Sequence, residues 1–102
     1  MQSMTSDKGV VGTWIYKAPG APYEYAKGEI IIKKDKGIYS AEIKFEYESI
    51  EMDEITVEKN TVVLKFDIEE TPIKIILKME GDSMTGISET PDGELELTGK
   101  RK

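Results

Sequence analysis

Residues 61–79 read TVVLKFDIEETPIKIILKM, and they decide the fold. On both sides of the central Glu-Glu-Thr-Pro, every second residue is apolar and its neighbours are mostly charged or polar. Alternation with a period of two is typical of β-strands with one buried and one solvated face, as in antiparallel sheets. The stretch therefore predicts two antiparallel strands joined by a tight turn.

Two turns predict which residues of neighbouring strands face each other. A two-residue turn at Glu70-Thr71 places every apolar residue of the first strand opposite an apolar residue of the second. Another two-residue turn at Gly81-Asp82 extends the ladder to the next strand. The predicted pairs are Leu64 with Leu77, Asp67 with Lys74, and Met79 with Met84.

The same alternation continues outward in both directions, and the periodicity typical of helices is missing almost everywhere. Within residues 50–58 the alternation changes phase, because Ile50 and Met52 have one parity and the following apolar residues the other. This change predicts a β-bulge near Asp53-Glu54. Eight strands are expected, near residues 12–18, 25–34, 38–48, 50–58, 61–69, 72–80, 83–89 and 94–101.

The predicted architecture is all-β. A meander of eight short strands, with no amphipathic helix to cover its apolar face, hides that face by closing on itself. We therefore expect an eight-stranded antiparallel up-and-down barrel, with a partly open β-roll or sandwich as the alternative. The 102 residues suffice for one domain, expected at 9–102 after a flexible N-terminal segment at 1–8.

Charge and composition exclude several partners and chemistries. The 20 acidic and 14 basic residues give a net charge of −6, whereas nucleic-acid binding requires a basic surface. The acidic excess lies within residues 42–70, which we interpret as a solvated sheet face. The chain has no cysteine and no histidine, so disulfides, thiolate nucleophiles and Cys/His metal sites are excluded.

Targeting signals are not evident in the sequence. No apolar run is long enough to span a bilayer as a helix. The first residues, Met1–Met4, lack the apolar core of a signal peptide, so none is expected. These features fit a cytoplasmic protein and a trimmed periplasmic or secreted one equally well.

Three short motifs carry a family resemblance. Gly12-Thr13-Trp14 opens the first predicted strand, residues 81–86 read GDSMTG, and the chain ends in LTGKRK at 97–102. This arrangement resembles the lipocalin-like, or calycin, barrels, and in particular small bacterial lipocalin-like domains of unassigned function. The resemblance implies a barrel in which a basic residue of the last strand covers the tryptophan of a G-x-W motif. The chain differs from ordinary lipocalins in its shorter length and in lacking their C-terminal helix and disulfides.

Gly12, Trp14 and Arg101 are predicted to be structural residues. Alternation places Gly12 and Trp14 on one face of the first strand, and Arg101 on the corresponding face of the last strand. In a closed barrel these strands are neighbours, so the guanidinium lies over the indole and gains a cation–π attraction. A single tryptophan in a small domain is more often a core residue than a ligand contact.

Residues 18–25, which read APGAPYEY, form the least regular stretch of the chain. In a lipocalin-like domain this connection lies over the barrel mouth, where its tyrosines border any cavity. The alternative is that the tyrosines only cap the core. An apolar cavity of about 300 Å³ or more would suit a small lipid or aromatic compound, and a smaller void would leave only the structural role. The candidate ligand-binding residues are Tyr16, Tyr23, Tyr25, Phe45, Phe66 and Met79.

Two functions remain open from the residues alone. The first is a non-catalytic domain that binds a small apolar or amphipathic ligand inside the barrel. The second is a structural or interaction module with a filled barrel, an accessory to a larger protein or a homodimer, which a contiguous patch around outward-facing Val63 and Ile76 would favour. We expect no enzyme activity, cofactor or metal site, because no nucleophile–base pair, phosphate-binding loop or spaced metal-ligand set is present.

Overall fold

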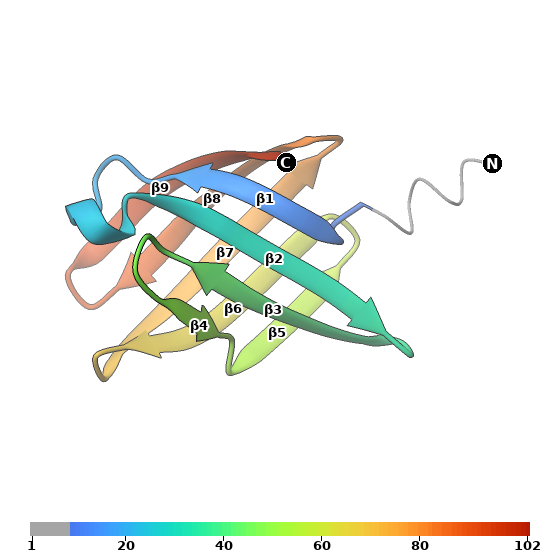
Figure 1. Cartoon of the computed structure of the whole chain (residues 1–102), viewed down its shortest axis with the longest axis horizontal. Coiled ribbons are helices and arrows are strands. Elements are labelled where there is room, and N and C mark those ends of the chain that lie inside the picture. Colours follow the sequence, from blue (N-terminus) through green and yellow to red (C-terminus); the bar gives the residue numbers. More distant parts are fainter. Residues whose placement is uncertain (1–8) are drawn as a thin grey trace.

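The backbone of the described residues is almost entirely β-strand (Figure 1). The computed structural model describes residues 9–102, so the flexible segment predicted at 1–8 lies outside the described residues. The all-β antiparallel prediction is confirmed, with nine strands in place of eight, and none of the described helices is long and apolar enough to cross a membrane. The elements are β1 (Gly12–Lys17), the 3-10 helix η1 (Tyr23–Tyr25), β2 (Lys27–Asp35), β3 (Ile38–Lys44), β4 (Ser49–Glu51), β5 (Glu54–Glu58), β6 (Thr61–Ile68), β7 (Thr71–Glu80), β8 (Ser83–Thr90) and β9 (Gly93–Arg101).

The nine strands form one strongly curled sheet in the order β4-β3-β2-β1-β9-β8-β7-β6-β5 (Figure 1). Apart from β4 and β5, strands that follow each other in the chain pair with each other, and β1 also pairs with β9. The β1–β9 register sets Trp14 opposite Arg101 and Tyr16 opposite Gly99. The curl turns the apolar face of every strand toward one common interior.

The strand predicted at 50–58 is two strands, β4 and β5, separated by Met52 and Asp53. β4 pairs with β3 and β5 pairs with β6, at opposite ends of the strand order. Two consecutive backbone amides connect these two ends of the sheet. Met52 N–H donates to Ala41 O in β3 (3.0 Å), and Asp53 N–H donates to Lys65 O in β6 (2.9 Å). The predicted β-bulge near Asp53-Glu54 is therefore wrong: the phase change marks a change of partner strand, which keeps the apolar side chains of both strands against the same core.

The turn between β6 and β7 lies one residue earlier than predicted, and the predicted register is wrong. Its residues are Glu69 and Glu70, both with positive φ (51° and 70°), which matches the twist of a two-residue hairpin. Positive φ is uncommon for residues other than glycine, so the sequence did not indicate this turn. A shift of two residues leaves every side chain on its predicted face. The observed pairs are Leu64 with Ile75, Asp67 with Pro72, and Val62 with Leu77.

The core is apolar, and no polar or charged residue within 9–102 is buried. The turn at Gly81-Asp82 has the predicted register, which sets Met79 opposite Met84. Tyr47, which the alternation of the predicted strand 38–48 places inside, is 85% exposed, because β3 ends at Lys44 and the chain turns at 45–48. The largest fully buried side chains are Trp14, Ile30, Ile32, Ile43, Val62, Leu64, Leu77, Met79 and Met84.

Candidate functional site

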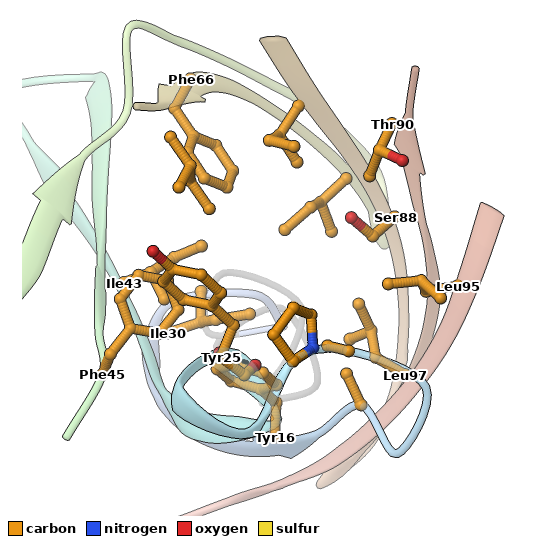
Figure 2. Close-up of a pocket in the computed structure, with 16 residues that line it drawn as sticks. Tyr16, Tyr25, Ile30, Ile43, Phe45, Phe66, Ser88, Thr90, Leu95 and Leu97 are labelled. Carbon is orange, nitrogen blue, oxygen red and sulfur yellow. Dashed lines mark hydrogen bonds between the residues drawn. The ribbon is translucent and has the colours of Figure 1, made fainter. Parts of the chain in front are cut away.

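An apolar cavity of about 110 Å³ lies inside the curled sheet, at the end where four connections between strands meet. These connections are the β1–β2 segment at 18–26, the β3–β4 turn at 45–48, the β6–β7 turn at 69–70 and the β8–β9 turn at 91–92. Side chains from strands on all sides surround the space (Figure 2). We call this end of the sheet the mouth.

Residues 18–26 form a lid at the mouth with a defined backbone. Ala18 N–H donates to Ala26 O (2.6 Å) and closes the base of the lid. Tyr25 N–H donates to Pro22 O (2.8 Å), which forms the single turn of η1. Ala18, Ala21, Pro22 and Tyr25 line the cavity. The lid therefore contributes directly to the cavity wall.

Tyr16 connects the lid to the core. Its side chain is buried on β1, and its hydroxyl donates a hydrogen bond to the backbone oxygen of Tyr25 (3.0 Å). Burial raises the pKa of the Tyr16 hydroxyl well above its ordinary value, so the group remains a neutral donor at physiological pH. The Tyr25 ring in turn packs edge-to-face on Phe45, with ring centroids 4.8 Å apart. These contacts hold an aromatic pair at the mouth.

The Tyr25 hydroxyl lies in a negatively charged environment. Its pKa is raised by desolvation and, in addition, by the charges of Glu69, Glu48 and Glu24. Each of these carboxylates belongs to a different connection. Negative charge therefore reaches the mouth from several sides.

Two hydroxyl side chains of β8 interrupt the apolar lining. Thr90 Oγ1 donates to Gly93 O (3.0 Å) and accepts a bond from Asp92 N–H (3.1 Å), so it stabilises the β8–β9 turn. Ser88 also lines the cavity, and its hydroxyl is directed toward the open space in Figure 2. Within residues 9–102 this hydroxyl has no hydrogen-bond partner, so it is available to a ligand.

The other end of the interior is closed by Trp14 and Arg101. Trp14 is fully buried, and its Nε1–H donates to Val10 O (3.0 Å). The Arg101 guanidinium lies over the indole with Cζ 4.3 Å from the ring centroid, which is the packing predicted from strand parity. Gly12 has a φ of 139°, and a Cβ there would lie 2.7 Å from Arg101 Nη1. Glycine at this position therefore makes room for the guanidinium.

Four of the six candidate ligand-binding residues line the cavity, and two do not. Tyr23 begins η1 instead of continuing a strand, and its side chain is 79% exposed. Met79 is buried, but it lies close to the β7–β8 turn at the Trp14 end, opposite Met84. Alternation predicts which face of the sheet a side chain occupies, but not where along the strand a cavity lies. The residues that do line it are Tyr16, Tyr25, Phe45 and Phe66.

Ser88, Thr90 and the aliphatic part of the lining were not predicted as site residues. Ser88 and Thr90 have the same parity as Met84, which was predicted to face inward. This shared parity was the sequence signal that could have identified them as inward-facing. None of the aliphatic residues was assigned to a cavity, and Ala18, Ala21 and Pro22 were predicted only as part of the connection over the mouth. The aliphatic residues of the lining are Ala18, Ala21, Pro22, Ile30, Ile43, Ile68, Ile73, Ile75, Leu95 and Leu97.

The acidic residues near the β4–β5 junction do not form a comparable site. Glu54 Oε1 lies 3.6 Å from Lys65 Nζ, and both side chains are exposed. In the part of the chain that the structure describes, no three acidic side chains are arranged to hold a metal ion. In comparisons with known proteins, no family model, no curated protein and no solved structure matches this chain.

Proposed function

We propose that this chain is a non-catalytic, lipocalin-like domain that binds one small apolar group in the cavity at the mouth. In this proposal the curled sheet is a closed up-and-down barrel. The pairing of β1 with β9 supports closure on one side, and the amides of Met52 and Asp53, bonded to β3 and β6, support it on the other. The packing of Arg101 on Trp14 supports the lipocalin-like resemblance.

The size and lining of the cavity carry the proposal. Its volume of about 110 Å³ is smaller than the ~300 Å³ expected from the sequence for a small lipid or aromatic compound, so that expectation is wrong and a sterol or an entire long-chain lipid does not fit. It is closer to the ~150 Å³ of an apolar protein cavity that takes up benzene. The occupant is therefore one ring or one short alkyl chain.

The wall is mostly apolar, with a few hydroxyl groups. Isoleucine, leucine and aromatic side chains form most of the lining, and the hydroxyl-bearing residues among them are Tyr16, Tyr25, Ser88 and Thr90. No carboxylate, lysine or arginine lines the cavity. A nucleophile with a neighbouring base is the usual requirement for covalent or acid–base catalysis, and the lining offers no such pair. Binding without chemistry is the function that these residues support.

Methyl NMR tests the proposal directly. Selective labelling of isoleucine δ1 methyl groups gives five probes in the wall: Ile30, Ile43, Ile68, Ile73 and Ile75. Titration with benzene, toluene and cyclopentane is expected to shift these signals saturably, with a Kd of about 1 mM for about 4 kcal/mol of binding free energy. Signals of the exposed Ile15, Ile38 and Ile87 serve as internal controls and are expected to stay in place.

A matched pair of variants separates cavity binding from surface binding. Ala21→Met extends a side chain into the cavity, whereas Ala26→Met makes the same change in the lid at a residue that does not line it. Ala21→Met is expected to abolish the shifts and Ala26→Met to leave them unchanged. If the wild-type wall methyl groups show no saturable shift with any of the three compounds, the proposed function is wrong.

A structural or interaction role is the second candidate, and a row of outward apolar side chains favours it. Val63 lies opposite Ile76, and Ile76 opposite Ile87, across β6, β7 and β8. Ile87 is 39% exposed, and contiguous apolar patches mark interaction surfaces. A molecular mass that rises with concentration in sedimentation, and that Ile87→Lys returns to the monomer value, would support this candidate.

A further inference from the structure

The connections at the mouth carry negative charge and no positive charge. The four segments at 18–26, 45–48, 69–70 and 91–92 contain six exposed carboxylates, and in these described segments there is no lysine or arginine. The nearest lysines on the adjoining strands, Lys17, Lys27 and Lys44, are exposed and follow the outward-facing parity. The six carboxylates are those of Glu24, Glu46, Glu48, Glu69, Glu70 and Asp92.

The opposite end of the sheet has a different charge, so the acidic mouth does not merely reflect the net charge of the chain. The turns there contribute Lys36 and Lys59. Asp82 in the third turn pairs with Arg101 (2.9 Å). Among the connections between strands, negative charge is thus concentrated at the end where the cavity opens.

Aromatic rings accompany the carboxylates at the mouth. Tyr23 and Tyr47 are exposed, at 79% and 85%, on the two connections that also hold the edge-to-face pair of Tyr25 and Phe45. Aromatic faces attract organic cations, and quaternary or primary ammonium groups are the usual ligands of such sites. Exposed carboxylates add a screened attraction for the same charge.

We propose that the occupant of the cavity is a small organic cation, an ammonium group that carries one aromatic ring or a short alkyl chain. The apolar end enters the cavity, and the ammonium group stays at the mouth among Tyr25, Phe45 and the carboxylates of the connections. This inference rests on the proposed function, because it requires the cavity to take up a ligand. Beyond the proposed function, it specifies that the ligand is positively charged.

The expected preference is moderate because the carboxylates are exposed. Single exposed ion pairs contribute little, but several carboxylates and an aromatic pair act on the same cation. We expect a primary ammonium ligand to bind about 5- to 20-fold more tightly than its neutral isostere at low salt. The ratio is expected to shrink between about 20 mM and about 500 mM salt, since the Debye length falls below the separation of exposed charges.

Three isosteric ligands test the inference with the isoleucine methyl probes described above. Benzylamine is the cation at neutral pH, benzyl alcohol the neutral compound and benzoate the anion. The expected order of affinity is benzylamine, then benzyl alcohol, then benzoate. Equal affinity for benzylamine and benzyl alcohol would overturn the inference and leave the proposed function standing. Absence of binding by all three, while toluene still binds, would overturn the inference and leave the proposed function standing, whereas absence of binding by toluene as well would overturn both.

Two triple variants of equal net charge test whether the mouth is responsible. Glu24→Gln, Glu48→Gln and Glu69→Gln together neutralise the mouth and are expected to remove the preference for benzylamine without weakening benzyl alcohol binding. The control is Asp35→Asn, Glu58→Gln and Glu80→Gln, which neutralises three exposed carboxylates toward the Trp14 end. All six positions are exposed, so both proteins are expected to fold. An equal loss of preference in the control would show a global charge effect and would overturn the inference.

Discussion

Removal of the Arg101 side chain is expected to destabilise the protein strongly. The guanidinium lies 4.3 Å from the Trp14 ring centroid, donates to Val11 O (2.5 Å) and Gly9 O (3.3 Å), and pairs with Asp82 (2.9 Å). A partly desolvated cation–π contact contributes about 1–2 kcal/mol. A hydrogen bond from a charged donor to a carbonyl contributes about 1.5 kcal/mol or more. The Asp82 side chain is 83% exposed, so its ion pair adds little.

Arg101→Ala is therefore expected to lower the free energy of unfolding by about 3 kcal/mol, or the Tm by roughly 10–20 °C for a chain of this size. Urea denaturation followed by fluorescence measures the loss, because Trp14 is the sole tryptophan of the sequence. The native emission of the variant is expected to shift to longer wavelength as water reaches the indole. Asp82→Asn is the control and is expected to cost under about 1 kcal/mol. If the two variants lose the same small amount, the assignment of Arg101 as the cover of Trp14 is refuted.

Three further predictions follow from the core and the backbone. Leu77→Ala is expected to cost about 2–5 kcal/mol in urea unfolding because the side chain is fully buried, whereas Ile87→Ala on the outer face is expected to cost about 1 kcal/mol or less. Gly12→Ala is expected to destabilise far more than Gly37→Ala, since a Cβ at 12 meets Arg101 Nη1 and one at 37 meets nothing, although both glycines have positive φ; equal Tm losses would contradict this. Burial raises the pKa of Tyr16 above its ordinary 10.0, so the folded state keeps the proton that the unfolded state loses, and stability is expected to fall as the pH rises above about 10. Tyr16→Phe is expected to flatten that alkaline decline in a pH series of Tm values, and an unchanged decline would contradict the assignment.

The faces of the strands were predictable from the sequence, and the details that depend on backbone conformation were not. Alternation placed Leu64, Leu77 and Trp14 in the core, because the period of two is a property of any extended chain. The predicted register of β6 and β7 was wrong because the turn residues Glu69 and Glu70 adopt positive φ, for which glutamate has no intrinsic preference. The change of partner strand at Met52 was visible only as a change of phase, since its cause lies in strands distant in the sequence.

The candidate site was predictable in part for a related reason. Tyr16 reaches the cavity from the strand before the connection over the mouth and Tyr25 from within that connection, which was recognisable from its prolines and glycine. Met79 was assigned to the cavity because parity makes every inward residue of a strand equivalent. Its actual distance from the mouth depends on strand length and on the stagger of the sheet, which no local pattern contains. The acidic character of the mouth combines four connections that are separate in the sequence.

The pairing of β1 with β9 also bears on the order of folding. Every other strand pair within the described residues joins strands adjacent in the chain, whereas Arg101 and Val11 are 90 residues apart. Closing a loop of that length costs about 4 kcal/mol of chain entropy, which the local hairpins β6–β7 and β7–β8 do not incur. The hairpins are therefore expected to form early and the β1–β9 ladder late. Contacts across that ladder, including Arg101 on Trp14, are then expected to be unformed in the folding transition state, which gives kinetic φ-values near zero for mutations there. Such mutations are expected to accelerate unfolding more than they slow folding.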